Sequence, residues 1–156
     1  GMKAKDIVFV DNKGKYQGIW KPSSEWMFHL DILKNRKEFN VVVHNHPAYG
    51  SGMSILRKDI KPYHYMIGFM GGDTIKCSTF APPGTKELSK AALKALKDRK
   101  ACLLANHGTI SCGKDLEEAM FLTEEFEILC KQHRCHIGGA HRHAGMARVR
   151  GLHGVH

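Results

Sequence analysis

The sequence has no long hydrophobic run and few cysteines for its length. No apolar segment approaches the roughly 20 residues that cross a bilayer, and the N-terminus carries no signal-peptide pattern, so we expect no membrane partner. The five cysteines are an odd number at no regular spacing, which argues against a disulfide framework. Free thiols in a reducing compartment are the natural interpretation, and we expect a cytoplasmic protein.

The last part of the chain lacks acidic residues altogether. Residues 133–156 contain four arginines and six of the eleven histidines, but no lysine and no acid. In the rest of the chain the lysines are dispersed among acids, so the net charge of +9 does not indicate a nucleic-acid partner, and anionic metabolites explain it equally well. We expect one domain over residues 1–132, followed by an irregular basic tail over residues 133–156.

The hydrophobic pattern predicts strands and helices that alternate along the chain, which indicates an α/β layered domain. The expected elements are a hairpin over residues 7–20, a helix over 22–34, a strand over 41–44 that ends at Pro47 and the following glycines, two strands between 63 and 80 joined by a turn at 71–73, a helix from Thr85, a strand over 101–105 and a helix from Asp115.

Three histidines stand at the ends of apolar strands. In His44-Asn45-His46 the two imidazoles project from the same face of a strand and can reach one ion. His107 follows a second apolar strand, and we expect Gly108 to permit the turn after it. A single His-x-His motif more often consists of core or surface histidines whose hydrogen bonds are satisfied. The presence of His107 after a second apolar strand favours a divalent-metal site instead, with zinc the natural ion.

The segment Ser23-Ser24-Glu25 opens the first predicted helix. Free backbone amides at a helix N-terminus favour an anion such as a phosphate. Alternatively, the serines are an ordinary N-cap, and Glu25 only compensates the helix dipole. Tyr65 belongs to a polar-aromatic cluster of a kind that serves packing more often than catalysis. The residues by themselves therefore predict a metal site and little more.

Five stretches resemble the class II aldolase/adducin family in order and spacing. The resemblance covers about residues 6–132 and implies a three-layer α/β/α domain with a central, largely antiparallel sheet between helices. The stretches are Pro22-Ser23-Ser24-Glu25-Trp26, Val42-Val43-His44-Asn45-His46, His64-Tyr65-Met66-Ile67, Gly84-Thr85-Lys86-Glu87-Leu88 and Asn106-His107-Gly108.

The resemblance implies a zinc-dependent lyase that cleaves a ketose 1-phosphate, of the L-fuculose 1-phosphate type, into dihydroxyacetone phosphate and an aldehyde. His44, His46 and His107 match the family's zinc ligands. Glu25 matches an acid that binds zinc at rest and acts as a base when substrate displaces it.

Two further roles follow from the same resemblance. Ser23 and Ser24 match serines that contact the substrate phosphate. Tyr65 matches a tyrosine supplied by a neighbouring subunit of a homotetramer, which handles the proton on the aldehyde oxygen.

The chain also departs from the family pattern. Gly1 before Met2 resembles a protease scar, and the chain starts after an N-terminal segment and a glycine-asparagine loop that complete the family's phosphate pocket. We therefore expect the metal site to be retained and turnover to be impaired. Two alternatives stay open: a pentulose-phosphate 4-epimerase with the same metal chemistry, and a non-enzymatic interaction module like the adducin head domain.

Overall fold

A four-stranded mixed sheet forms the centre of the domain in the computed structural model, which describes the backbone of residues 1–150 and the side chains of residues 1–135. Its strand order is β3-β6-β5-β4, and β6 pairs antiparallel with both of its neighbours, whereas β4 and β5 are parallel. The strands are β3 (Val41–Asn45), β4 (Lys76–Cys77), β5 (Ala101–Leu104) and β6 (Gly108–Gly113). The prediction of a largely antiparallel sheet is confirmed.

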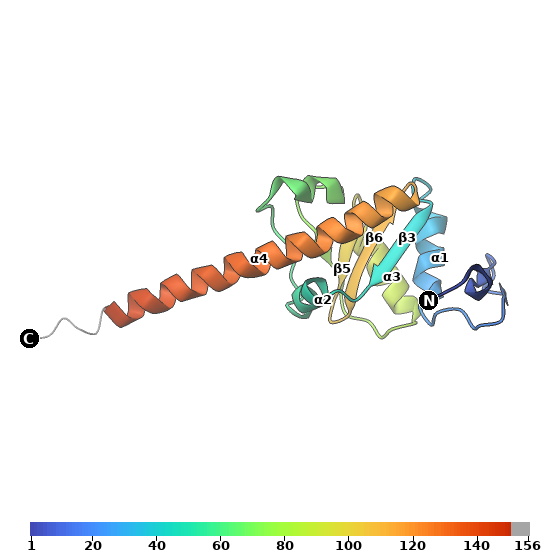
Figure 1. Ribbon diagram of the computed structural model, residues 1–156, viewed down its shortest axis with the longest axis horizontal. Helices are drawn as coiled ribbons and strands as arrows, with labels where there is room; N and C mark the ends of the chain where they lie inside the picture. Colours follow the sequence, from blue (N-terminus) through green and yellow to red (C-terminus); the bar gives the residue numbers. More distant parts are fainter. Residues whose placement is uncertain (151–156) are drawn as a thin grey trace, which may run out of the picture.

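Helices cover both faces of this sheet (Figure 1). One face carries α1 (Trp26–Asn35) and α3 (Lys86–Ala95), and the other carries α2 (Ala48–Ile55) and α4 (Leu116–Arg150). Strand β5 shows the alternation, because Cys102 and Leu104 pack with α1 and α3, whereas Ala101 and Leu103 pack with α2 and α4. The three-layer α/β/α architecture is therefore confirmed.

Two of the predicted helix starts carry side-chain caps. The Thr85 hydroxyl accepts a hydrogen bond from the backbone amide of Leu88 at 3.2 Å at the start of α3. Before α4, the Asp115 carboxylate accepts one from the amide of Glu118 at 2.8 Å. The expected apolar face of α4 is buried against the sheet, with Ala119, Leu122, Phe126 and Leu129 in the core.

A separate hairpin lies at the N-terminal end, as the sequence predicts. It pairs β1 (Phe9–Val10) with β2 (Tyr16–Gln17), after the short 3-10 helix η1 (Ala4–Asp6). The Asp11 carboxylate closes the turn by accepting from the amides of Lys13 and Lys15.

One local expectation is wrong, and two elements were not expected. The first strand expected after residue 63 is a 3-10 helix, η2 (Tyr65–Met70), because the His64 ring caps it by accepting from the Met66 amide. Strand β3 ends before Pro47, as expected, but the helix α2 that begins after Pro47 was not expected. Strand β6 was not expected, although Ile110 and Cys112 alternate with polar residues along it.

The expected irregular tail is also wrong for the backbone up to Arg150, because α4 continues to that residue and extends away from the sheet (Figure 1). No proline follows Pro83 to interrupt a helix. The division into residues 1–132 and 133–156 stays a prediction, and residues 151–156 lie outside the described part. Among the described residues, no helix is long and apolar enough to cross a membrane.

Candidate metal centre

Glu25 lies immediately before α1, at the end of the helix that approaches β3. Its amide donates a hydrogen bond to the Ser23 hydroxyl at 3.2 Å, which closes a local turn before the helix, whereas α1 itself has no side-chain cap. The Glu25 side chain turns inward, because the residue is only 8% exposed. An almost fully buried carboxylate requires polar or charged partners.

His44 is one of those partners, and its orientation is fixed from both sides. Its Nδ1 lies 2.9 Å from the backbone oxygen of Thr109 on β6, so this nitrogen must carry the proton and donate it. Its Nε2 then presents a lone pair and lies 2.9 Å from a Glu25 carboxylate oxygen. A backbone carbonyl that sets the tautomer in this way is the usual support of a metal-binding histidine.

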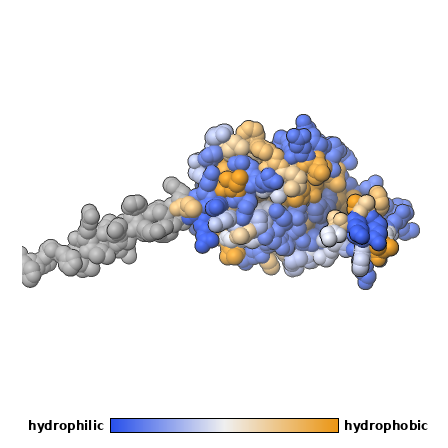
Figure 2. All heavy atoms as spheres, in the orientation of Figure 1, coloured by the Kyte–Doolittle hydropathy of each residue, from blue (hydrophilic) through white to orange (hydrophobic). Residues whose placement is uncertain are grey.

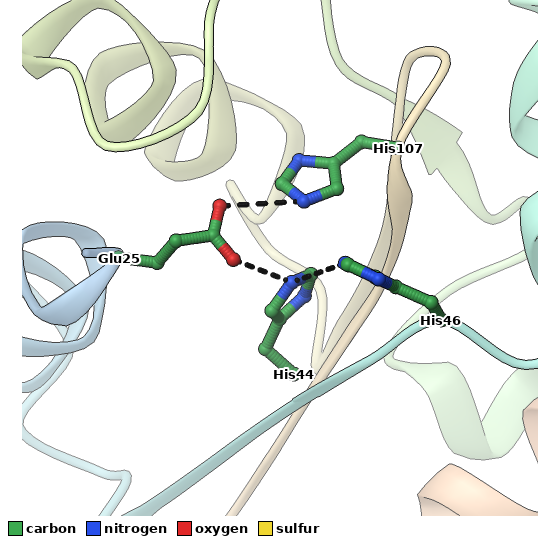
Figure 3. Close-up of side chains that lie close together, drawn as sticks. All are labelled: Glu25, His44, His46 and His107. Atoms are coloured by element: carbon green, nitrogen blue, oxygen red, sulfur yellow. Dashed lines mark hydrogen bonds and ion pairs between the residues drawn. The ribbon is translucent and has the colours of Figure 1, made fainter. Parts of the chain in front are cut away.

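His46 lies just beyond the end of β3 and points back toward His44. The two Nε2 atoms are 3.0 Å apart, and Figure 3 shows the rings converging. Gly108 makes this approach possible, because a Cβ there would lie 2.7 Å from the His46 ring and 2.5 Å from the Asn45 carbonyl oxygen. The expected role of Gly108 as a turn residue is wrong: it is the first residue of β6, and its missing side chain makes room for His46.

His107 lies on the tight connection between β5 and β6. Asn106 takes the left-handed conformation of this connection, with φ of 57°, which asparagine tolerates better than most residues. The amides of both residues are held by α2: Asn106 donates to the Ser54 carbonyl, and His107 donates to the Ser54 hydroxyl at 3.1 Å. The His107 Nε2 lies 3.3 Å from the second Glu25 oxygen.

The four side chains thus converge on one point (Figure 3). One ligand atom from each of Glu25, His44, His46 and His107 lies within 4.8 Å of the others. The structure therefore brings together all four residues expected at the metal site.

The chemistry of this donor set fits a divalent cation. Burial lowers the pKa of His107, which keeps its ring neutral and its lone pair available at neutral pH. The Glu25 oxygen nearest His107 is buried and makes no hydrogen bond, as expected of an atom whose natural partner is an ion. Three imidazoles and a displaceable carboxylate match the donors of catalytic zinc sites.

The remaining predicted site residues are placed differently. Ser23 and Ser24 are exposed beside Glu25, and Gly84 packs closely on them, because a Cβ there would lie 2.9 Å from the Ser24 carbonyl oxygen. Tyr65 is 79% exposed on η2. That helix ends at Met70, whose carbonyl accepts from the Lys100 amide before β5, whereas His107 follows β5 at the opposite end of the strand. Tyr65 is thus not brought to the cluster of its own chain.

Sequence reasoning missed the residues that support the ligands. Thr109 and Ser54 are buried and hold His44 and the chain around His107. The alternation of Thr109 and Ser111 with apolar residues was a signal for a strand beside His44. No sequence signal indicates the role of Ser54, because its partner lies 53 residues away.

The His29 side chain lies one helical turn after Glu25, stacked on Phe28 with ring centroids 4.6 Å apart. Burial, reinforced by the positive charge that His44 can carry, lowers the pKa of His29 from 6.5 to about 4. His29 therefore becomes protonated below about pH 6.5 in the unfolded chain, but only near pH 4 in the folded chain. The free energy of unfolding is unaffected by His29 above pH 6.5. It falls as the pH drops from 6.5 to about 4, by up to about 3 kcal/mol, because protonation then favours the unfolded chain.

We predict that His29→Gln removes this part of the acid sensitivity. Urea unfolding with chelator present, at about pH 7 and about pH 4.5, should show the wild-type protein losing about 2–3 kcal/mol more than the variant. The lowered pKa of His107 acts in the same direction but is common to both proteins. Equal losses in the two proteins would contradict the assignment.

Comparison with known proteins agrees with this geometry. The sequence model of the class II aldolase and adducin N-terminal domain matches residues 1–133. The chain is 44% identical over 135 residues to 5-methylthioribulose-1-phosphate/5-deoxyribulose-1-phosphate aldolase of Rhodospirillum rubrum, covering 86% of this chain and 61% of the relative. It is 46% identical over 125 residues to L-fuculose phosphate aldolase of Escherichia coli K12, covering 80% and 58%.

A solved structure of an L-fuculose 1-phosphate aldolase superposes with a TM-score of 0.83 at 34% identity, over 88% of this chain and 65% of that one. The chain thus spans about three fifths of the length of the curated relatives that it matches. The family match covers the segments that carry the four clustered side chains. The chain belongs to the class II aldolase and adducin N-terminal domain family.

Proposed function

We propose that this chain carries the metal centre of a zinc-dependent aldolase that cleaves a ketose 1-phosphate into dihydroxyacetone phosphate and an aldehyde. The observation that carries the proposal is the buried Glu25 carboxylate, which lies against His44 on one side and His107 on the other. A structural zinc site has no need of a carboxylate that substrate can displace, whereas a catalytic site must keep such a position. All-free cysteines, three of them buried, support the cytoplasmic location that we include in the proposal.

The protein's own groups can carry the protons of this reaction. In the cleavage direction a base accepts the proton of the hydroxyl on the carbon that becomes the aldehyde. The carbon–carbon bond breaks, and its electron pair remains on the dihydroxyacetone phosphate fragment as an enediolate. Protonated Glu25 then delivers a proton to the carbon of this fragment, and in the synthetic direction it removes that proton.

Zinc held by His44, His46 and His107 would supply a Lewis acid that stabilises the negative charge of the enediolate oxygens. The exposed pair Ser23 and Ser24 lies next to Glu25 and can donate hydrogen bonds to the substrate phosphate. This arrangement holds the phosphate end of the substrate on the N-terminal side of α1, with the reacting carbon toward Glu25.

The relatives favour two substrates. One set is named for L-fuculose phosphate and the other for 5-methylthioribulose 1-phosphate, which both carry the ketose 1-phosphate that the mechanism needs. The test is release of dihydroxyacetone phosphate from each compound by the zinc-loaded chain, compared with the chelated chain and with Glu25→Gln. Zinc-dependent release that needs Glu25 supports an aldolase. Zinc binding without release from either compound above the Glu25→Gln background would contradict it and favour an adducin-like interaction module.

The proposal includes a homotetramer, in which Tyr65 of a neighbouring copy acts as the base at the aldehyde end. Tyr65 stands on η2 beside an exposed aromatic pair, Phe69 and Phe121, which are 51% and 45% exposed with ring centroids 6.0 Å apart. Figure 2 shows hydrophobic side chains over this part of the surface, where η2 lies on α4. Exposed aromatic pairs of this kind are typical of protein interfaces.

We predict that Phe69→Glu dissociates the assembly and lowers aldolase activity by about tenfold or more, because it places a charge in an apolar contact and removes Tyr65 from the neighbour's site. Light scattering and the cleavage assay measure the two effects. Phe9→Glu is the matched control, since Phe9 is 72% exposed on the hairpin away from η2. A wild-type protein that stays monomeric at high concentration would remove Tyr65 from the mechanism.

A further inference from the structure

Thr109 is a buried residue of β6 that makes contacts in three directions. It lies directly opposite Asn45 in the pairing of β3 with β6 and is 2% exposed. Its carbonyl accepts from His44, and its hydroxyl donates to the Asn45 side-chain oxygen at 2.5 Å. Its methyl group faces α2, where a Cβ on Gly50 would lie only 2.6 Å away.

Asn45 separates the two histidines of the His44-Asn45-His46 motif. Because side chains alternate along a strand, the Asn45 amide projects from the opposite face to the His44 ring. Strand β3 ends at Asn45, so the next residue, His46, has no ladder partner to fix it. The Asn45 side chain is thus the last anchor on this strand before His46.

We propose that Thr109 is a positioning residue of the metal centre, whose hydroxyl holds Asn45 and through it keeps the His46 ring aimed at His44. This inference deepens the proposed metal site and rests on it. The carbonyl of Thr109 orients His44 in any variant, since every residue has a carbonyl. The hydroxyl orients the end of β3 only while a threonine or serine stands there.

The Thr109 hydroxyl acts on His46, which has the fewest supporting contacts of the three histidines. His44 is fixed by a hydrogen bond to Thr109, and His107 by the Ser54 hydroxyl at its amide. His46 has neither kind of support, and its position depends on the backbone angles of Asn45 and on contact with Gly108. Residues that orient metal ligands typically change metal affinity by about 10–100-fold when they are replaced.

The decisive variant is Thr109→Val, which keeps the shape and the methyl contact with α2 but removes the hydroxyl. Competition with a zinc chelator should show an affinity at least about tenfold below that of the wild type. Thr109→Ser should restore most of the affinity, because it returns the hydroxyl. Ser111→Ala is the matched control, since Ser111 lies on the same face of β6 and is buried, but its hydroxyl has no partner.

A double-mutant cycle tests the path through Asn45. Asn45→Ala should reduce zinc affinity as much as Thr109→Val does, and the double variant should lose little more, because both changes break one hydrogen bond. Additive losses would overturn the path. Should Thr109→Val fail to fold, Asn45→Ala decides alone, because Asn45 is only half-buried at a strand end.

Metal-free protein gives a second readout. Imidazole nitrogen spectra by NMR should show one ordered His46 ring in the wild-type chain and an exchanging ring in Thr109→Val, while His44 keeps its Nδ1 proton in both. An unchanged His46 spectrum together with zinc affinity within about twofold of wild type would overturn the inference. Absence of zinc binding by the wild-type chain would instead overturn the proposed metal site, and the spectra would still report on Thr109.

Discussion

His44→Ala is expected to weaken zinc binding by about a hundredfold. His44 touches both Glu25 and His46, and its Nε2 is the central atom of the cluster (Figure 3). Zinc sites with four protein ligands bind with apparent free energies of about 10–16 kcal/mol, so one ligand accounts for ~3 kcal/mol, or ~two powers of ten in affinity. Zinc content after dialysis against a weak chelator measures the effect.

The control for this variant is His64→Ala. His64 caps η2 and stacks on Tyr65, away from the cluster, so its removal should leave zinc content unchanged. Thermal unfolding of the chelated proteins checks that both variants are folded. Full zinc content in His44→Ala would show that the ion binds elsewhere.

Glu25→Gln is expected to separate catalysis from metal binding. Glutamine has nearly the same shape and can still fill the space between His44 and His107, but it cannot carry a proton to or from carbon. Positioned general acid–base groups contribute about 10²–10⁴-fold to rate, and we predict a fall of that size in kcat/KM for cleavage of the ketose 1-phosphate. Zinc should remain bound through the three histidines, with affinity reduced by about tenfold or less.

Glu38→Gln serves as the control, because Glu38 is exposed and pairs only with Arg36 at the far end of α1. Its kcat/KM should stay at the wild-type value. If Glu25→Gln retained wild-type activity, Glu25 would be a resting ligand and nothing more. If it lost zinc together with activity, the carboxylate would be a permanent ligand, and the proposed base would be wrong.

The sequence was sufficient to predict that three histidines cluster, because each one stands at or just beyond the end of an apolar strand, whereas the resemblance to the family placed Glu25 beside them. His44 and His46 share a face through the two-residue period of a strand, and His107 is the third residue after the buried strand β5. The same local logic predicted α3 from Thr85 and the buried face of α4. These elements depend on hydrophobic periodicity and capping, which a single sequence carries.

The supports of the site depend instead on pairing between distant segments. Thr109 supports His44 only because β6 lies beside β3 in a register that places Asn45 opposite Thr109. Sequence patterns do not specify which strands are neighbours, and β6 itself was not expected. Glu127 illustrates the same point: it accepts from the amides of Tyr49 and Gly50, which are 78 and 77 residues away, and so holds the start of α2.

The proposed assembly could not be predicted from the physical properties of one chain. Tyr65 and the pair Phe69 and Phe121 have ordinary exposed positions on its surface. The resemblance to the family supplied the role of Tyr65. The structure of the single chain shows only that Tyr65 is exposed and lies away from the four clustered side chains.

We propose above that histidine nitrogens and a carboxylate hold one zinc ion. Cysteine thiols are the rival ligands in this chain, but partial burial raises the pKa of Cys77 to about 11 and burial raises that of Cys112 to about 12, which disfavours the thiolates that bind metal. X-ray absorption of the zinc-loaded protein distinguishes nitrogen and oxygen ligands from sulfur ligands. We expect about one zinc per chain with nitrogen and oxygen neighbours at about 2.0–2.2 Å, whereas a sulfur shell at about 2.3 Å, or no bound zinc, would show that the proposed ligands are wrong.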